Sequence, residues 1–343
     1  MPGAALAALL WLVPTVQAEP LIYNILDFQF EDGTVLPELR IAYETHGALG
    51  PARDNAILLI PGASADRHAF DAEIGPGKTF DTDKYFVINA DPLGGGESAA
   101  PADGMGQDFP RYTIRDMMAA EAALVSQQLQ LPSLRAVCGS AMGGDVALEL
   151  AVHHPDLVRG LVLLAPNPAA DAGLRLVLDL LISVVALDPE WQGGRYARNP
   201  IEGLRHAGML YYPWTVSAAY IDRIAPQRLD QEVEAAAQAF AGWDANALVL
   251  RYGAYRAHDI AAPYKEDMHA ALSRIAAPVL LLPSTSDRLI AGQGAKLIRD
   301  GVQHAVYAEI PGDLGHRAIR VAPEGAAWDF IDERIRAFFA TLK

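Results

Sequence analysis

The sequence predicts an α/β fold built on a mostly parallel, doubly wound sheet, with a block of helices inserted between two of its strands. Short apolar runs typical of buried strands recur along the 343 residues, and helix-length segments separate them. Between about residues 166 and 274 this alternation stops, and helical periodicity continues alone. Hydrophobic residues make up 51% of the chain and charged residues 20%, so a large buried core is available.

Six runs rich in aliphatic side chains predict the central strands, and a pair of alternating segments predicts an antiparallel edge. The edge pair is Tyr23 to Phe30 and Leu39 to Glu44, with Glu31-Asp32-Gly33 as the turn between them. Strands joined by helix-length segments run parallel, so most of the sheet is expected to be parallel. The central runs are residues 56–60, 85–90, 135–140, 160–165, 278–283 and 306–311.

Helical periodicity predicts the remaining elements. Thr113 to Leu129 is predicted as a helix that Thr113 caps. The inserted helices are residues 174–187, 201–211, 216–224, 231–241 and 245–256, and a closing helix spans residues 322–342. These elements divide the chain into a core of residues 19–165 and 275–343 and a helical cap of residues 166–274.

One tight turn between a strand and a helix carries the chemistry. Its sequence is Gly139-Ser140-Ala141-Met142-Gly143. This is where the α/β-hydrolase fold holds its nucleophile, in a Gly-x-Ser-x-Gly frame on a strained turn. The two glycines flank Ala141, so the nucleophile position holds alanine. If Ser140 were the nucleophile, Cys138 and Met142 would flank it, and the methionine would crowd the turn.

Three explanations account for the alanine at position 141. A catalytic serine has been replaced in an engineered, inactive variant that holds its substrate uncleaved. Alternatively, the chain is a natural protein that has lost catalysis, or the segment is an ordinary glycine-rich turn. The acid and the base described next argue against the ordinary turn, because they are the partners that a catalytic serine needs.

Asp287 and His316 are the predicted acid and base. Asp287 lies shortly after the strand at 278–283, and His316 follows the strand at 306–311 on a glycine-rich loop. This is the order nucleophile, acid, histidine of the α/β-hydrolases. The histidine would act as general base and then as general acid, and the aspartate would orient it and stabilise its protonated form. Asp313 is a rival acid, but it lies in the same loop as His316 and is poorly placed to face it.

Two backbone N–H groups are expected to form an oxyanion hole. One belongs to Met142, the residue after the nucleophile position, at the positive end of its helix. The other comes from the loop that follows the strand at 56–60, and we expect it to belong to Ala63.

Composition excludes several classes of function. The net charge of −15 argues against a nucleic-acid partner, because no basic patch is present. The single cysteine, Cys138, cannot form an internal disulfide, and no Cys/His cluster has the spacing of a zinc site. We therefore expect no metal and no cofactor.

The N-terminus resembles a secretory signal peptide. Ala4 to Val13 is an unbroken apolar run, too short to span a bilayer, and Val16-Gln17-Ala18 has the small-x-small pattern of a cleavage site. We expect residues 1–18 to be removed and the protein to be periplasmic or secreted, without stable membrane insertion. No Lys or Arg precedes Arg40, so a cytoplasmic location is the alternative.

Several stretches resemble the homoserine O-acetyltransferase-like branch of the α/β-hydrolases. They are residues 42–47, 75–88, 93–95, 109–117, 142–144, 187–196 and 243–246. The resemblance runs from about residue 35 to His316. It implies a triad position at Ala141 with Asp287 and His316, a small-molecule ester or acyl substrate, and often a homodimer joined through cap helices.

Two departures from that family bear on the reaction. The acetyltransferases carry a His-Ala-Leu-Thr-Gly-type oxyanion loop, where this chain has Pro61-Gly62-Ala63-Ser64-Ala65. They also keep an arginine six residues before the Asp-Pro of the cap, associated with the carboxylate of the amino-acid substrate. This chain has Ile182 at that place, and an aliphatic side chain cannot bind a carboxylate. Arg175, one or two turns away, is a conceivable replacement.

The sequence therefore predicts a serine esterase or acyl hydrolase that works through an acyl-serine intermediate and here lacks its nucleophile. Two alternatives stay open. An O-acyltransferase of the homoserine acetyltransferase type would use acyl-CoA, and a catalytically dead binding protein would keep only the pocket.

Overall fold

The computed structural model describes residues 19–320 and 325–342, so the predicted signal peptide lies outside the described part of the chain. An eight-stranded sheet forms its centre, with the strand order β1-β2-β6-β3-β7-β8-β9-β10. β1 and β2 pair antiparallel, as do β2 and β6, and the neighbours from β6 to β10 are parallel. The strands are β1 (Leu21–Gln29), β2 (Val35–His46), β3 (Ala56–Ile60), β6 (Phe86–Ala90), β7 (Ala136–Ser140), β8 (Leu161–Leu164), β9 (Val279–Leu282) and β10 (Ala305–Tyr307).

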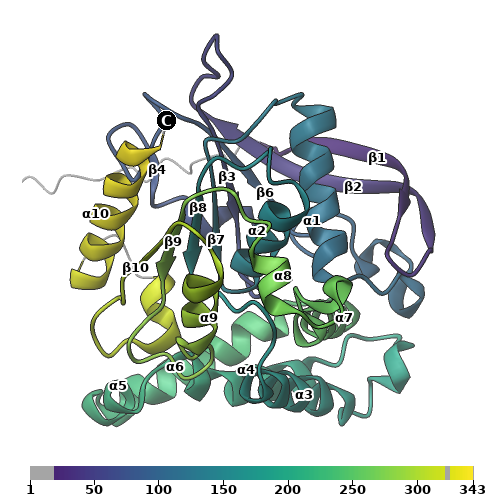
Figure 1. Ribbon diagram of the computed structural model, residues 1–343. Coiled ribbons are helices and arrows are strands. Elements are labelled where there is room, and N and C mark those ends of the chain that lie inside the picture. Colours follow the sequence, from purple (N-terminus) through teal and green to yellow (C-terminus); the bar gives the residue numbers. More distant parts are fainter. Residues whose placement is uncertain (1–18, 321–324, 343) are drawn as a thin grey trace, which may run out of the picture.

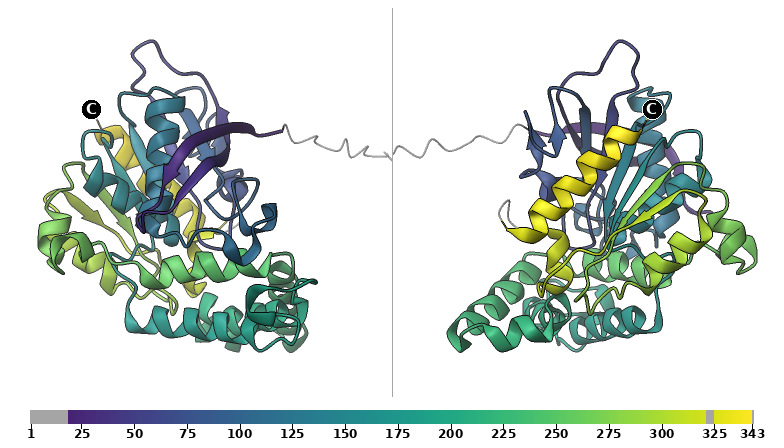
Figure 2. Two further views of the ribbon diagram at one scale, coloured as in Figure 1. Left: turned by 90° about the vertical axis from the view of Figure 1, so that its right-hand side faces the viewer. Right: turned by 60° about the vertical axis from the view of Figure 1, so that its left-hand side comes forward.

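The central strands β3, β7, β8 and β9 are short and contain only buried residues. Such runs are typical of parallel strands that helices cover on both faces. Helices α1 (Ile114–Ala123), α2 (Met142–His153) and α9 (Gln293–Gly301) pack on one face, and α10 (Ala326–Thr341) packs on the other (Figure 2). A two-stranded ribbon of β4 (Ile74–Gly75) and β5 (Phe80–Asp81) lies apart from this sheet.

A separate group of helices lies between β8 and β9 in the chain. In Figure 1 most of them form a layer below the sheet. They are α3 (Ala172–Ala186), α4 (Ile201–Thr215), α5 (Ala218–Arg223), α6 (Pro226–Ala241), α7 (Ala245–Ala257) and α8 (Met268–Leu272). We call α3 to α7 the cap helices. The pairs α3–α4, α4–α6 and α3–α7 pack against one another.

Several elements differ from their predicted bounds or geometry, among them β2, which begins at Val35, and α6, which begins at Pro226. β10 ends at Tyr307 instead of continuing to residue 311, because its neighbour Pro283 has no N–H group to extend the ladder. Helix α4 runs through Pro213 to Thr215, since a proline in the last turn removes only one hydrogen bond. The helix capped by Thr113 changes from α to π geometry over Leu124–Gln128.

Candidate active site

The turn between β7 and α2 holds Ala141 in a strained conformation. Its backbone angles are φ 50° and ψ −121°, a region that residues other than glycine rarely adopt. Such strain costs about 1–3 kcal/mol and persists only where the surrounding structure enforces it. An ordinary turn would place glycine here. Ser140 is instead the last residue of β7 and has regular strand geometry.

Gly139 and Gly143 are the residues that allow this turn to form. A Cβ atom on Gly139 would lie 2.2 Å from the carbonyl oxygen of Gly143. A Cβ atom on Gly143 would lie 2.2 Å from the carbonyl oxygen of Ile60 and 2.4 Å from that of Pro61. Both contacts are with backbone atoms that cannot rotate away. The glycine frame around position 141 therefore has a steric cause, and it brings α2 against the end of β3.

Asp287 and His316 meet at the same end of the sheet. His316 Nδ1 lies 2.6 Å from Asp287 Oδ2. The other carboxylate oxygen, Oδ1, accepts hydrogen bonds from the N–H groups of Leu289 at 2.8 Å and Ile290 at 3.0 Å. The Asp287 side chain is fully buried. An aspartate held in this way can fix the orientation of the imidazole and leave Nε2 free for proton transfer.

The loop that carries His316 is attached to the cap helices. Gly315, at φ 68°, has no room for a side chain, since a Cβ atom would lie 2.7 Å from the backbone of Val216 and Ser217. Asp313 binds Arg223 of α5 through two hydrogen bonds of 2.9 and 3.0 Å. Asp313 is therefore engaged with the cap, and it is Asp287 that contacts His316.

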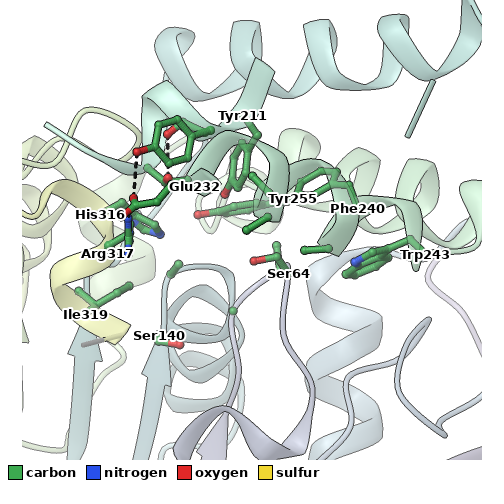
Figure 3. A pocket seen from close by; sticks show the side chains of 18 of the residues that line it. Ser64, Ser140, Tyr211, Glu232, Phe240, Trp243, Tyr255, His316, Arg317 and Ile319 are labelled. Atoms are coloured by element: carbon green, nitrogen blue, oxygen red, sulfur yellow. Dashed lines mark hydrogen bonds and ion pairs between the residues drawn. The ribbon is translucent and has the colours of Figure 1, made fainter. Parts of the chain in front are cut away.

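A cavity of about 520 Å³ separates the sheet from the cap helices. Ala141 and His316 both line it, as do Ala63 and Ser64 of the loop after β3. Figure 3 shows Ser64 and Ser140 on one side of this cavity, and cap side chains on the other. The cap contributes mainly aromatic and small residues: Tyr211, Tyr212, Thr215, Ala235, Ala236, Ala239, Phe240, Trp243 and Tyr255.

Three charged side chains line the cavity beside His316. Glu232 of α6 accepts hydrogen bonds from Arg228 at 2.7 Å and from Arg317 at 2.5 Å. The hydroxyls of Tyr212 and Tyr220 donate to the same carboxylate, at 3.0 and 2.8 Å. The two guanidinium groups and one carboxylate give this wall a formal charge of +1, opposite in sign to that of the whole chain.

The two predicted oxyanion donors lie at the start of α2 and in the loop after β3. Met142 is the first residue of α2, where backbone N–H groups have no partner within the helix. Ala63 is buried and lies in a turn that a hydrogen bond of 3.1 Å from Ala65 N–H to Gly62 C=O closes.

Sequence reasoning missed the charged wall of the cavity. Arg317 follows His316 directly and could have been noticed for that reason. Arg228 and Glu232 come from a cap helix, and no local pattern indicates that they face the cavity. Ile182, by contrast, is half-buried on α3 and is not among the residues that line the cavity in the described part of the chain.

Residues 19–320 and 325–342 contain no group of three or more His, Cys, Asp or Glu side chains placed to hold a metal ion. None of the helices there has the length and apolar character needed to cross a membrane.

The model of the alpha/beta hydrolase fold family matches residues 55–319. A homoserine O-acetyltransferase of Leifsonia xyli is 31% identical over 358 aligned positions, which cover 91% of this chain and 87% of that protein. A homoserine O-succinyltransferase of Aromatoleum aromaticum is 31% identical over 328 positions, covering 83% of this chain and 87% of that protein.

Two solved structures superpose on most of this chain. An acetylester hydrolase from Corynebacterium glutamicum superposes with a TM-score of 0.88 at 25% identity, covering 94% of this chain and 96% of that one. A homoserine O-acetyltransferase from Bacillus anthracis superposes with a TM-score of 0.84 at 25% identity, covering 94% and 98%. The chain is thus similar both to acyltransferases and to an ester hydrolase.

Proposed function

Because the chain belongs to the homoserine O-acyltransferase-like branch of the α/β-hydrolase family, we propose that its pocket serves acyl transfer to a small hydroxyl compound. The observation that carries the proposal is the strained position of Ala141 in a cavity that also contains the His316–Asp287 pair. Strain of this kind is kept where a side chain must be presented to a substrate. We propose that serine occupies position 141 in the active form.

With serine at 141, the reaction has two steps. His316 Nε2 accepts the serine proton while the serine oxygen attacks the acyl carbonyl, and the N–H groups of Ala63 and Met142 bind the resulting oxyanion. The protonated His316 then gives its proton to the leaving group. In the second step His316 accepts the proton of the acceptor hydroxyl, whose oxygen attacks the acyl carbonyl. The bond between the acyl group and the serine oxygen breaks, and His316 returns its proton to that oxygen. Ala141 has no oxygen to acylate, so the present chain can bind substrate without following this route.

The charged wall of the cavity supports transfer over hydrolysis. The expectation of a hydrolase rested in part on Ile182, which would deprive an amino-acid acceptor of its carboxylate partner. Ile182 is not a lining residue, whereas Arg228 and Arg317 are. We infer that these arginines hold the carboxylate of an acceptor such as homoserine, because each has further N–H groups besides the one that binds Glu232.

Hydrolysis is the second candidate function. It is favoured by the similarity to an acetylester hydrolase and by the largely apolar remainder of the cavity, which suits an uncharged ester. The two reactions share the acyl-serine and differ in whether water or a bound alcohol accepts the acyl group.

One experiment separates these functions. Ala141→Ser protein would be incubated with acetyl-CoA or succinyl-CoA, with and without homoserine, and the products identified by mass spectrometry. Transfer predicts O-acyl-homoserine as the main product, and Arg317→Met in the same background should raise the KM for homoserine at least about tenfold. Release of free acid at a rate independent of homoserine would establish hydrolysis instead. A protein that folds and does neither would be a binding protein.

We further propose that the protein forms a homodimer through its cap. Leu176, Leu180 and Leu187 of α3 and its C-terminal end are 58%, 40% and 80% exposed. Leu176 and Leu180 are four residues apart and share one face of the helix. An exposed apolar stripe of this kind is typical of a surface that another chain covers.

A further inference from the structure

Arg251 of α7 lies beneath the cap, against the loop that follows β3. Arg251 is only 1% exposed. Its Nη1 donates to the carbonyl oxygens of Ala63 at 3.2 Å and Ala65 at 3.4 Å. The Cζ atom lies 4.7 Å from the centre of the Trp243 ring. One buried cation therefore connects a cap helix with the segment expected to supply an oxyanion donor.

The loop that Arg251 contacts is a tight turn. The hydrogen bond from Ala65 N–H to Gly62 C=O places Ala63 and Ser64 at its centre, and both line the cavity. Because each peptide unit is planar, holding the carbonyl groups of Ala63 and Ala65 fixes the planes of the peptides that follow them. These planes contain the N–H groups of Ser64 and Asp66. The Ala63 N–H lies in the preceding peptide, whose Gly62 carbonyl accepts the hydrogen bond from Ala65 N–H in the same turn.

Stability alone does not account for an arginine in this place. Its side chain also interacts with the neutral hydroxyl of Tyr112, but its Nε atom is buried and has no hydrogen-bond partner within the described part of the chain. Gly95 leaves room for it, since a Cβ atom there would lie 1.7 Å from Nη2. A buried cation whose donors are incompletely satisfied lowers stability, so an apolar side chain would suit the core better. Such exceptions to core composition are found where function requires them.

We propose that Arg251 is a positioning residue that holds the turn at residues 62–65 in the geometry of an oxyanion hole. The catalytic part of this inference rests on the proposed acyl-transfer function. The guanidinium does not line the cavity, so it acts on the reaction through the backbone of Ala63 and through its positive charge behind the turn. It also makes the geometry of the oxyanion hole depend on the docking of α7.

The structural part is tested in the present chain, without any turnover. Hydrogen–deuterium exchange of peptides covering residues 60–66 would be compared between the parent protein, Arg251→Met and Arg256→Met. Arg256 lies on the same helix, is exposed and pairs with Asp179, so it is a matched control. Arg251→Met should accelerate exchange in this segment by on the order of tenfold, and Arg256→Met should not. Equal exchange in all three proteins would overturn the proposal.

The catalytic part is tested in the Ala141→Ser background with a p-nitrophenyl ester. Adding Arg251→Met should lower kcat per active site by about ten- to a hundredfold, with KM changed less than about threefold, because an oxyanion hole acts on the transition state. The amplitude of the acylation burst counts active sites, so loss of folded protein does not imitate this result. Gly95→Ala, which displaces Nη2, should have the same effect, and Arg251→Lys should recover part of the rate.

A thiono ester provides the sharper comparison, because its sulfur is a weak hydrogen-bond acceptor. The preference for the oxo ester over the thiono ester should fall on Arg251→Met and stay unchanged on Arg256→Met. An unchanged preference, with activity lost only through fewer active sites, would overturn the positioning role. If Ala141→Ser is itself inactive, the proposed function fails, and the exchange experiment still decides whether Arg251 holds the turn.

Discussion

The backbone at position 141 is set by its surroundings and not by the alanine side chain. Gly139 and Gly143 let the backbone of α2 approach β7 and β3 to distances that no Cβ atom would permit. The N–H group of Ala141 donates to Leu164 C=O at 2.8 Å, which fixes the turn from the neighbouring strand. These contacts do not involve the side chain at position 141, so they impose the same strained backbone on whichever residue stands there.

This strain predicts that Ala141→Gly stabilises the protein. Glycine removes a backbone strain of about 1–3 kcal/mol but loses about 0.5–1 kcal/mol through the greater freedom of the unfolded chain. The free energy of unfolding should rise by about 1 kcal/mol, as measured by urea titration. Gly253→Ala, at a half-buried helical site with open space around the added Cβ atom, serves as a control for the intrinsic difference between the two residues. A lower stability of the Ala141→Gly protein would mean that the turn is relaxed.

The sequence alone was sufficient to predict the active-site residues that follow strands. Asp287 and His316 lie in loops at the carboxyl ends of neighbouring parallel strands, and sheet topology brings such loops together. The sequence alone could not place Arg228, Glu232 or Arg251 at the site, because they lie on cap helices. Helical periodicity predicts which face of a helix is buried, but not whether that face meets a core, a cavity or a loop.

At the scale of elements, the junction between α6 and the histidine loop depends on one carboxylate. Burial by itself would raise the pKa of Glu232, but hydrogen bonds from Arg228, Tyr220, Arg317 and Tyr212 lower it from 4.5 to about 2. The Glu232 side chain is only 9% exposed, whereas those of Arg228 and Arg317 are 62% and 43% exposed, so solvent screens part of the interaction. A group with a lowered pKa stabilises the folded state above its unfolded pKa, and this contribution is lost as the pH falls.

Glu232→Gln should therefore lower the free energy of unfolding at neutral pH by on the order of 2 kcal/mol. The difference from the parent protein should shrink as the pH falls from about 4.5 to about 2, because the parent loses the same contribution by protonation. Urea titrations across this range measure the difference. A gap that stays constant with pH would show that the ionisation of Glu232 contributes nothing to stability.

A comparison of the predicted and observed bounds of the elements shows where local sequence patterns are sufficient to predict them. The buried strands were predicted closely, because an aliphatic run bounded by glycine and proline has few alternatives. The end of β10 was not predicted, since it depends on Pro283, the residue that follows the neighbouring strand β9. The extension of α4 through Pro213 likewise depends on packing against α3 and α6, which the sequence of α4 alone does not contain.

At the scale of the whole molecule, the cap determines both the pocket and the proposed assembly. The inner faces of its helices line the cavity, while α3 exposes Leu176 and Leu180 to solvent. If this surface joins two copies, Leu180→Asp should convert a dimer to a monomer in size-exclusion chromatography with light scattering. Leu26→Asp, at an exposed leucine on β1, is the matched control. A parent protein that is monomeric at tens of micromolar would exclude the proposed homodimer.

The most direct test of the central claim is the site of acylation in the Ala141→Ser protein. The protein would be mixed with an activated acetyl ester, quenched in acid within seconds, and its intact mass and peptide map determined. We predict one acetyl group per chain on residue 141, strongly reduced when His316→Ala is added and absent from the parent chain. No adduct in a folded Ala141→Ser protein, or an adduct on Ser140 or Ser64 instead, would contradict the assignment of position 141 as the nucleophile.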